Sequence, residues 1–503
     1  MKKFFVLHPF LFAIFPMLFI YSQNINEISL SEIIYATIII LVVVLLLQSL
    51  LPLIFLNKTK IALIISLSIF IFFFYGHIYE ILKGFSLLEF QIKSDKVILL
   101  ILFLIFVEGV YLIIKTRKNI ENLTYSLNIM SVSLIVISLA NIALHELKRT
   151  DTFEINKNDS IEISKEIVKN ASIMPDIYYI ILDAYTSSRA LKEIYDYDNS
   201  DFENFLSKKG FYIASESRSN YAETRLSLAS SLNMEHLNIL GELVDVPMLY
   251  KMINKNKVMQ ILKLHGYNII NVSSTNIGKI EEIENADLNF QTGCFLSVKF
   301  QAVLIETTIL RAFKKYFDFA YYYRKEILST FLLISEAQMK IKEPRFIFAH
   351  ILSPHPPYVF DPDGEPTYPT YQTLRLDAWG DLSFQKKLYL GQVIFVNKLL
   401  KNIIDKILSE TKREPIIIIQ GDHGPQLATN ERLNARMKIF NAYYLPKKDQ
   451  NFFYDSITPV NTFRLIFNHY FNTNYELLED KSYFTLYELP YHFVDVTDSV
   501  SNN

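Results

Sequence analysis

Two adjacent residues with metal-binding side chains, Asp422 and His423, follow four consecutive isoleucines, Ile416–Ile419, and stand between Gly421 and Gly424. An unbroken run of β-branched residues is typical of a strand buried in a parallel sheet. Ligands bind beyond the carboxyl ends of such strands in open α/β sheets. A carboxylate and an imidazole at that point predict a site for one Zn²⁺- or Mn²⁺-like ion. The alternative is a turn that only ends the strand.

Asp183 repeats this arrangement, because it ends a second apolar segment, residues 176–183, ahead of a helix expected over 187–195. Asp is also a common helix N-cap, which is the structural alternative for Asp183. Thr224 stands where a loop enters a helix that has small residues at 227 and 229–231. Free N–H groups at a helix start favour an anionic group. Thr224 could equally serve only as the N-cap of that helix.

Two histidines, His350 and His355, occupy a third strand-then-loop segment, residues 346–358. The chain has ten histidines in all, so two within six residues indicate a functional cluster. For His350 the alternative is a hydrogen-bonded core residue at the end of a strand.

Asp183 after a strand, Thr224 at a helix start and Asp422-His423 after a strand together resemble the alkaline phosphatase/sulfatase superfamily over residues 175–490. The resemblance implies that these four residues hold one divalent ion, Zn²⁺ or Mn²⁺, with Mg²⁺ and Ca²⁺ as alternatives. It implies Thr224 as the nucleophile. Residues 426–432 lack the second histidine of two-metal relatives, which favours one tightly held ion.

The resemblance also implies a role for the two histidines. His355 matches the segment of the transferases whose histidine faces the phosphate or the leaving group, and His350 is the second candidate. A formylglycine-dependent sulfatase is disfavoured, because Thr224 stands at the nucleophile position without the Cys/Ser-x-Pro/Ala-x-Arg signal. The single cysteine, Cys294, lies in a different context and excludes an intramolecular disulfide framework.

The N-terminal part reads as a membrane anchor. Half of the residues are hydrophobic and the mean hydropathy is +0.19. Five apolar runs are each about long enough to cross a bilayer as a helix: Phe4–Tyr21, Ile33–Phe55, Ile61–Leu82, Val97–Ile114 and Tyr125–Leu144. Basic residues concentrate in the segments that are cytoplasmic if the N-terminus is inside, which places the chain after Leu144 outside.

The expected organisation is therefore a five-helix transmembrane bundle at 1–145, a hydrated linker at 146–174 and an extracytoplasmic α/β domain at 175–503. This domain is expected to be sulfatase-like, with a mainly parallel central sheet flanked by helices. Residues 296–340 are read as packing helices, with contact to the outer membrane face as the alternative. Glu108, within the fourth apolar run, is either a functional intramembrane carboxylate or paired with a neighbouring helix.

The layout resembles lipoteichoic acid synthases and lipid A phosphoethanolamine transferases of the bacterial inner (cytoplasmic) membrane. This resemblance implies a metal-dependent phosphoethanolamine- or phosphoglycerol-type transferase that works through a phospho-threonine. A membrane phospholipid would be the donor and an envelope glycan or lipid the acceptor. The alternatives are a membrane-anchored phosphodiesterase or sulfatase-like hydrolase, and a catalytically silent envelope scaffold. The net charge of −2 gives no indication of nucleic-acid binding.

Overall fold

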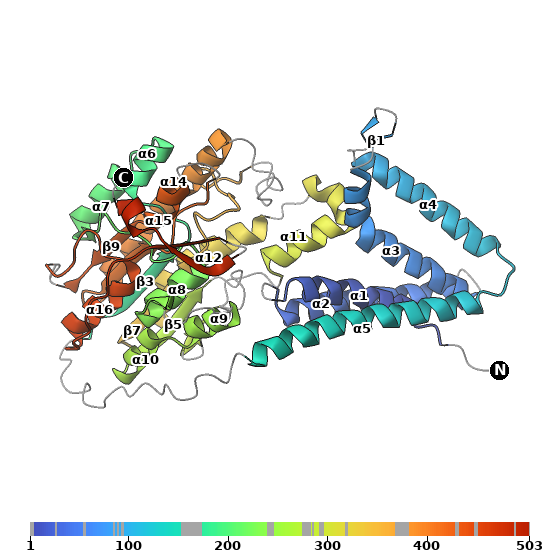
Figure 1. Ribbon diagram of the computed structural model, residues 1–503, viewed down its shortest axis with the longest axis horizontal. Helices are drawn as coiled ribbons and strands as arrows, with labels where there is room; N and C mark the ends of the chain where they lie inside the picture. Colours follow the sequence, from blue (N-terminus) through green and yellow to red (C-terminus); the bar gives the residue numbers. More distant parts are fainter. Residues whose placement is uncertain are drawn as a thin grey trace. The chain divides into compact units, whose positions relative to one another are not determined.

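The computed structural model contains two compact units (Figure 1). One unit comprises residues 1–156 and 295–319, and the other comprises residues 157–294 and 320–503. The description covers residues 5–501 except 26–27, 54–56, 84–85, 88–89, 92–94, 152–173, 239–245, 274–282, 284–285, 291–295, 317–319, 368–381, 428–431, 447–450 and 487–488. Most of the predicted linker and Cys294 therefore lie outside the described residues.

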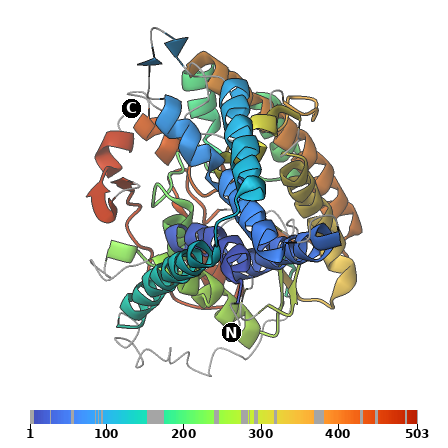
Figure 2. The same ribbon diagram turned by 90° about the vertical axis from the view of Figure 1, so that its right-hand side faces the viewer.

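The first unit is helical (Figure 2). Its N-terminal part contains α1 (His8–Gln23), α2 (Leu30–Leu50), η1 (Leu51–Leu53), α3 (Lys58–Lys83), β1 (Ser86–Leu87), β2 (Phe90–Gln91), α4 (Asp95–Lys115) and α5 (Glu121–Asp151). Four of these helices, α2 to α5, are long and apolar enough to cross a membrane. The first predicted run, Phe4–Tyr21, forms the shorter α1, whose 16 residues span about 24 Å.

A segment from the C-terminal half of the sequence joins this helical unit. Residues 295–319 contain α11 (Val298–Thr307) and the 3₁₀ helix η4 (Ile309–Tyr316), and both pack on α3. Gly76 makes the contact possible, because a Cβ at this position would lie 2.0 Å from the Glu306 carbonyl oxygen. The sequence predicts one continuous domain from residue 175. In the structure, residues 295–319, here called the insert, belong to the helical unit instead.

The insert contacts the start of α2, the end of α3 and the start of α4. The distribution of basic residues predicts that these helix ends lie on the outer side of the membrane. The Ser297 N–H donates to the Glu32 carboxylate at the start of α2. The Arg311 guanidinium lies 3.0 Å from the Glu80 carboxylate near the end of α3, and 4.0 Å from that of Asp95 at the start of α4. Because the insert comes from the C-terminal half, these contacts agree with the predicted outward topology of that half.

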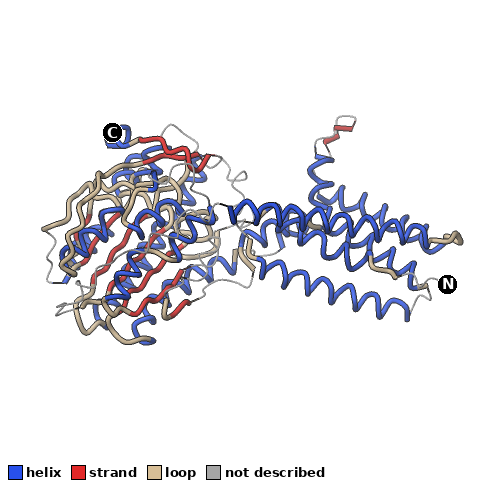
Figure 3. The backbone as a smooth tube through the Cα atoms, turned by 60° about the horizontal axis from the view of Figure 1, so that its bottom comes forward, coloured by secondary structure: helices blue, strands red, loops and turns tan. Residues whose placement is uncertain are grey.

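The second unit is built around a seven-stranded sheet of order β4-β9-β8-β3-β7-β5-β6 (Figure 3). Its strands are β3 (Ile177–Leu182), β4 (Tyr212–Ile213), β5 (Asn268–Ser273), β6 (Leu288–Asn289), β7 (Arg345–Ile351), β8 (Ile416–Gly421) and β9 (Asn441–Tyr444). All neighbouring pairs from β8 to β6 are parallel, while β9 pairs antiparallel with both β8 and β4. A small antiparallel pair, β10 (Tyr483–Leu486) and β11 (Leu489–Asp495), stands apart.

Helices cover both faces of the sheet, so the central strands are buried along their whole length. The helices are α6 (Ser188–Tyr195), α7 (Ser200–Lys209), α8 (Thr224–Asn233), α9 (Val246–Asn254), α10 (Lys257–Leu264), α12 (Tyr321–Lys340), α14 (Leu382–Glu410), α15 (Arg432–Met437), α16 (Pro459–Tyr470) and α17 (Thr497–Ser501). Ile177, Tyr179 and Ile181 of β3 share one apolar core with residues of α8, α9, α10 and α16. Helix α12 packs on β5 and β7 and against α14.

Strand β3 lies between β7 and β8 in the sheet. The chain passes from β7, on one side of β3, to β8, on the other side, so the order of the strands reverses at β3. The three strands are in register, with Leu182 opposite both Ile351 and Gly421. Loops that leave neighbouring parallel strands on opposite sides open a crevice at such a switch point. The side chains that follow β3, β7 and β8 are therefore brought together at one edge of the sheet.

Candidate metal and nucleophile site

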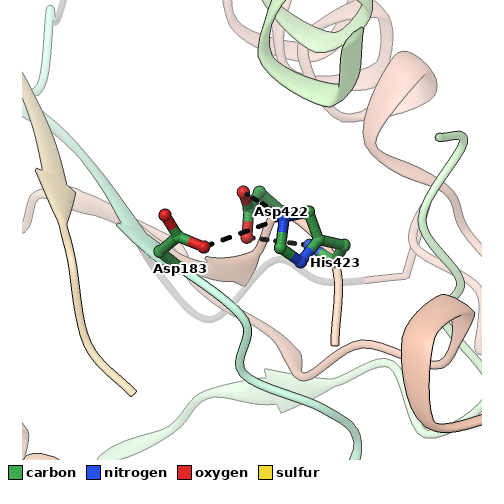
Figure 4. Close-up of side chains that lie close together, drawn as sticks. All are labelled: Asp183, Asp422 and His423. Carbon is green, nitrogen blue, oxygen red and sulfur yellow. Dashed lines mark hydrogen bonds and ion pairs between the residues drawn. The ribbon is translucent and has the colours of Figure 1, made fainter. Parts of the chain in front are cut away.

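Three buried metal-binding side chains meet at this edge: Asp183, Asp422 and His423 (Figure 4). Nε2 of His423 lies 3.4 Å from Oδ2 of Asp422 and 3.8 Å from Oδ1 of Asp183. One potential ligand atom from each residue lies within 4.8 Å of the other two, and each residue is at most 2% exposed. Among the described residues, these three side chains form the one group of His, Cys, Asp or Glu residues that is close enough together to hold a metal ion.

Each carboxylate presents one oxygen that the protein leaves without a partner. Oδ1 of Asp422 accepts hydrogen bonds from the backbone N–H groups of Ala184 (3.0 Å) and His423 (2.8 Å). Oδ2 of Asp422 and Oδ1 of Asp183 are buried with no hydrogen-bond partner among the described residues. A buried, unpartnered carboxylate oxygen is costly unless it is paired or coordinates a metal.

Electrostatics support the same interpretation. Burial raises the pKa of Asp183 to about 7, and burial together with the charge of Asp183 raises the pKa of Asp422 to about 7. Two carboxylates that resist ionisation in their own pocket need a compensating cation when both are charged. The residues present therefore fit a divalent metal ion, with Asp183, Asp422 and His423 as the side chains that would hold it.

Thr224 lies directly beside this group. Nδ1–H of His423 donates to the Gly424 carbonyl oxygen (2.9 Å), which leaves a lone pair on Nε2. The Thr224 hydroxyl therefore donates to Nε2, over 2.9 Å.

Thr224 is not the cap of its helix, contrary to the structural alternative. Helix α8 begins at Thr224, and Glu223 occupies the N-cap position without a side-chain cap hydrogen bond. The small residue Ser227 then brings the helix close, because its hydroxyl donates to the Asp422 carbonyl oxygen (2.7 Å), as does that of Ser219 (2.5 Å). Asp183 likewise caps no helix, since Ser187 caps α6.

The two predicted histidines occupy different positions. His350 is fully buried on β7, and Nε2 lies 3.6 Å from Oδ2 of Asp183. Neither ring nitrogen has a hydrogen-bond partner among the described residues, so the alternative of a hydrogen-bonded core histidine does not hold. His355 donates from Nδ1 to the Pro356 carbonyl oxygen (2.5 Å), and its ring centroid lies 6.5 Å from that of His423.

Both histidines are neutral at pH 7. Burial, with a smaller contribution from the charge of His355, lowers the pKa of His350 to about 3. Burial and the Arg436 guanidinium lower the pKa of His355 to about 4. Neither ring therefore carries the second, acidic proton that a general acid needs until an anionic group binds nearby and favours the charged form.

Arg436 is a residue of this site that the sequence reasoning missed. Its guanidinium lies on α15 and donates from Nε to the Ala222 carbonyl oxygen (2.6 Å) and from Nη1 to that of Gly424 (2.9 Å), while Nη2 lies 3.3 Å from Nε2 of His423. A cation held beside the nucleophile suits a phosphoryl oxygen. Its only sequence signal is a basic residue shortly after the Asp-His pair.

The glycines around the Asp-His pair have a steric role. A Cβ at Gly424 would lie 1.8 Å from the Ala435 carbonyl oxygen, and one at Gly421 would lie 2.3 Å from that of Tyr185. The Gly424 N–H donates to the Arg436 carbonyl oxygen (2.7 Å). The turn that presents Asp422 and His423 is therefore clamped between two other backbone segments, which only glycine permits.

The family model described as Sulfatase matches residues 195–466, more than half of the chain. The chain belongs to the sulfatase family. This family lies within the alkaline phosphatase/sulfatase superfamily, and its members are enzymes that include transferases. Thr224, His350, His355, Asp422 and His423 of this sulfatase-family chain fall inside the matched range, and Asp183 precedes it. No curated protein matches the chain.

Several solved structures are similar to this sulfatase-family chain. The periplasmic domain of phosphoethanolamine transferase EptC from Campylobacter jejuni is 12% identical, covering 61% of this chain and 92% of that one, with a TM-score of 0.40. The integral membrane lipooligosaccharide phosphoethanolamine transferase A from Neisseria meningitidis is 11% identical over 89% of both chains (TM-score 0.37). The zinc complex of the C-terminal periplasmic domain of EcEptC from Escherichia coli is 11% identical, covering 56% and 76% (TM-score 0.38).

Proposed function

We propose that this protein is a membrane-bound phospho-group transferase of the phosphoethanolamine or phosphoglycerol type, in which Thr224 forms a covalent phospho-enzyme. The observation that carries the proposal is the 2.9 Å hydrogen bond from the Thr224 hydroxyl to Nε2 of His423, beside two carboxylates. A hydroxyl this close to a metal-binding nitrogen would also reach an ion held there, and coordination to a metal is one way to activate a nucleophile for covalent catalysis. A catalytically silent scaffold would not need two buried carboxylates with raised pKa values.

Asp183, Asp422 and His423 would hold a divalent ion, with Zn²⁺ or Mn²⁺ favoured by the mixed oxygen and nitrogen ligands. When bound, the ion supplies Lewis-acid activation of the Thr224 hydroxyl and neutralises charge on the phosphoryl oxygens. Arg436 adds a fixed positive charge next to His423. Asp422 is held by two backbone N–H groups, so its free oxygen keeps one orientation.

The chemistry takes place in two displacements. Thr224 gives up its hydroxyl proton to solvent as Oγ1 attacks the phosphorus of a phosphodiester. A new Oγ1–P bond forms, the bond from phosphorus to the diacylglycerol oxygen breaks, and that oxygen takes up a proton so that diacylglycerol leaves. An acceptor hydroxyl then attacks the phospho-threonine, and Thr224 recovers its proton. His355 is the candidate to pass a proton to the leaving oxygen, because an anionic substrate would raise its pKa from about 4. Transfer to water instead of the acceptor would make the same site a hydrolase.

The membrane-spanning helices support a lipid donor, since a tethered domain encounters membrane substrates at a high local concentration. We infer that the protein resides in a bacterial inner membrane with the α/β unit outside. The acceptor is an envelope glycan or lipid.

The test uses full-length protein in micelles that contain phosphatidylethanolamine or phosphatidylglycerol labelled in the headgroup phosphate. We expect diacylglycerol release and labelling of Thr224, with both abolished in Thr224→Ala and partly kept in Thr224→Ser. Release of diacylglycerol without transfer to any added acceptor, and with free headgroup phosphate as the product, would show a hydrolase. Equal labelling of the wild type and Thr224→Ala would overturn the proposal.

A further inference from the structure

The α/β unit contains a cavity of about 420 Å³ that takes no part in the proposed metal and nucleophile chemistry. Its lining includes three cationic side chains, Arg189, Arg218 and Lys438, and one carboxylate, Glu216. None of the residues of the metal and nucleophile site lines it. Its volume is in the range of small-ligand sites, roughly 300–1,000 Å³.

The cavity lies at the same edge of the sheet as the candidate active site. Lys438 precedes β9, which is antiparallel to β8, so Lys438 lies beyond the carboxyl end of β8. Arg218 and Lys438 are bridge partners on two short antiparallel segments. The next residue, Ser219, bonds to the Asp422 carbonyl oxygen. Arg218, which lines the cavity, is thus adjacent in sequence to Ser219, which is hydrogen-bonded to a residue of the metal group.

The positive charge of the cavity is built into the fold. Arg218 is only 8% exposed, and its two Nη atoms donate to the carbonyl oxygens of Thr497 (3.2 Å) and Asp480 (3.3 Å), which carry no net charge. Its Nε–H is buried and has no hydrogen-bond partner among the described residues. Arg189 differs, because it already pairs with Glu193 (2.8 Å) and Glu216 (3.4 Å).

Lys438 adds to this charge, although its side chain is only 5% exposed. Burial, and then the neighbouring Arg189 and Arg218, lower the pKa of Lys438, while Glu193 and Glu216 oppose that shift. Cations buried near one another repel, and a bound anion relieves this repulsion. A guanidinium with a free N–H beside an ammonium suits the oxygens of a phosphate or carboxylate group.

We propose that this cavity binds a phosphate or carboxylate group of the acceptor substrate, next to the site where Thr224 carries the phospho-group. The assignment of the bound group to the acceptor rests on the proposed transferase function. The anion site itself does not, because it follows from the charge and burial of Arg218 and Lys438. An acceptor that carries an acidic group would thereby be fixed with a hydroxyl facing the phospho-enzyme.

The binding test uses full-length protein in neutral detergent, treated with a chelator so that the metal group cannot hold phosphate through an ion. Inorganic phosphate and acetate are titrated separately by calorimetry at pH 7.5. We expect phosphate to bind with a millimolar dissociation constant, and Lys438→Gln and Arg189→Gln each to weaken binding about 5- to 10-fold. Binding of acetate would mark carboxylates as ligands as well, and its absence would restrict the site to phosphate.

Lys208→Gln is the matched control, because Lys208 is an exposed cation on α7 outside the cavity lining. Its phosphate affinity should equal that of the wild type. Because Arg189 is exposed, Arg189→Gln should fold normally, so it tests the cavity even if the buried substitution Lys438→Gln disturbs folding. No phosphate binding, or binding that His423→Ala abolishes and Lys438→Gln leaves unchanged, would overturn the anion site.

A kinetic measurement separates this proposal from the transferase proposal. With the metal restored, Lys438→Gln should raise KM for an acidic acceptor about 10-fold and leave cleavage of the small diester bis(p-nitrophenyl) phosphate unchanged. If the wild type cleaves no diester but the calorimetric result holds, the transferase proposal fails while the anion site stands. If the diester is cleaved and acidic and neutral acceptors respond equally to the substitution, the acceptor role fails.

Discussion

The Thr224 hydroxyl lies 2.9 Å from Nε2 of His423, although 199 positions separate the two residues in the chain. Thr224 begins α8, while His423 follows β8, and the hydroxyl of Ser227 ties that helix to the Asp422 carbonyl oxygen. A helix start and a strand end are thus fixed to each other at the switch point of the sheet. Each part of this arrangement predicts a measurable result.

His423→Ala should abolish metal binding. Purified full-length protein should carry about one ion per chain, and the variant less than one tenth of that. His423 is one of only three protein side chains that would hold the ion, so its removal should lower the metal affinity sharply. Elemental analysis provides the measurement, and the exposed His492→Ala is the control. Equal metal content in wild type and His423→Ala would contradict the predicted ligand set.

Asp183→Asn should change stability in a pH-dependent way in the metal-free protein. The folded-state pKa of Asp183 is raised to about 7 from 3.8, so the folded wild type retains a proton that the unfolded chain releases. Its contribution to stability is complete below about pH 4 and is lost as pH rises through 7. The variant should match the wild type near pH 4 and exceed it above pH 7, by up to about 4 kcal/mol.

Chemical unfolding at pH 4.5, 6 and 8 measures this difference directly. Asp201→Asn is the control, because the Asp201 carboxylate is 91% exposed. A stability difference between Asp183→Asn and wild type that is constant with pH would show that folding does not raise the pKa of Asp183.

Arg436→Gln should reduce transfer about 10- to 100-fold, since one charge-assisted contact to the phosphoryl group is lost. It should also raise the pKa values of His355 and His423, because the guanidinium contributes to lowering both. Nuclear magnetic resonance titration of the imidazole protons in the metal-free protein measures the second effect. Arg436→Lys should restore the histidine pKa values more than the activity, because lysine keeps the charge without the planar fork.

Gly424→Ala should destabilise the α/β unit by about 2 kcal/mol or more and weaken metal binding, because the new Cβ would collide with the Ala435 carbonyl oxygen. Gly266→Ala separates this clash from backbone strain. Gly266 has a φ of +80° but no atom within 4 Å of an added Cβ, so the expected cost is about 1 kcal/mol with normal metal content. Thermal unfolding and elemental analysis of both variants provide the comparison.

Arg311→Gln should loosen the insert from the helical unit. The Arg311 guanidinium is 7% exposed and pairs with Glu306 and Glu80, and it lies 4.0 Å from the ring centroid of Tyr79. Hydrogen exchange in α11 and η4 should rise about 10-fold or more, since several charge-assisted contacts are lost together. Arg117→Gln, an exposed arginine after α4, should leave exchange unchanged.

Much of the site could be predicted because its residues directly follow buried strands. The apolar runs before Asp183 and Asp422 predict parallel strands, and the sheet brings their ends together. Thr224 needed the resemblance to known enzymes, since a threonine at a helix start usually has a purely structural role. Arg436 could not be found, because its position depends on how α15 folds back over the Asp-His turn.

The insert shows a second limit. Its apolar residues fit a core helix and a membrane-associated helix equally well, so periodicity cannot assign them to a unit. Three of the side chains around Arg311, those of Glu80, Asp95 and Tyr79, lie more than 200 positions earlier in the chain. Glu108, a candidate intramembrane site, is exposed on α4 with no partner among the described residues, so its predicted pairing with a neighbouring helix is not observed.

The insert also determines how the protein should respond to cleavage. A single cut between 152 and 173 separates the apolar helices α1 to α5 from the catalytic residues along the chain. The C-terminal fragment nevertheless keeps α11 and η4, which are embedded among those helices through Phe300 and Arg311. The two fragments should therefore copurify in mild detergent, and a nicked enzyme should remain at the membrane instead of being shed.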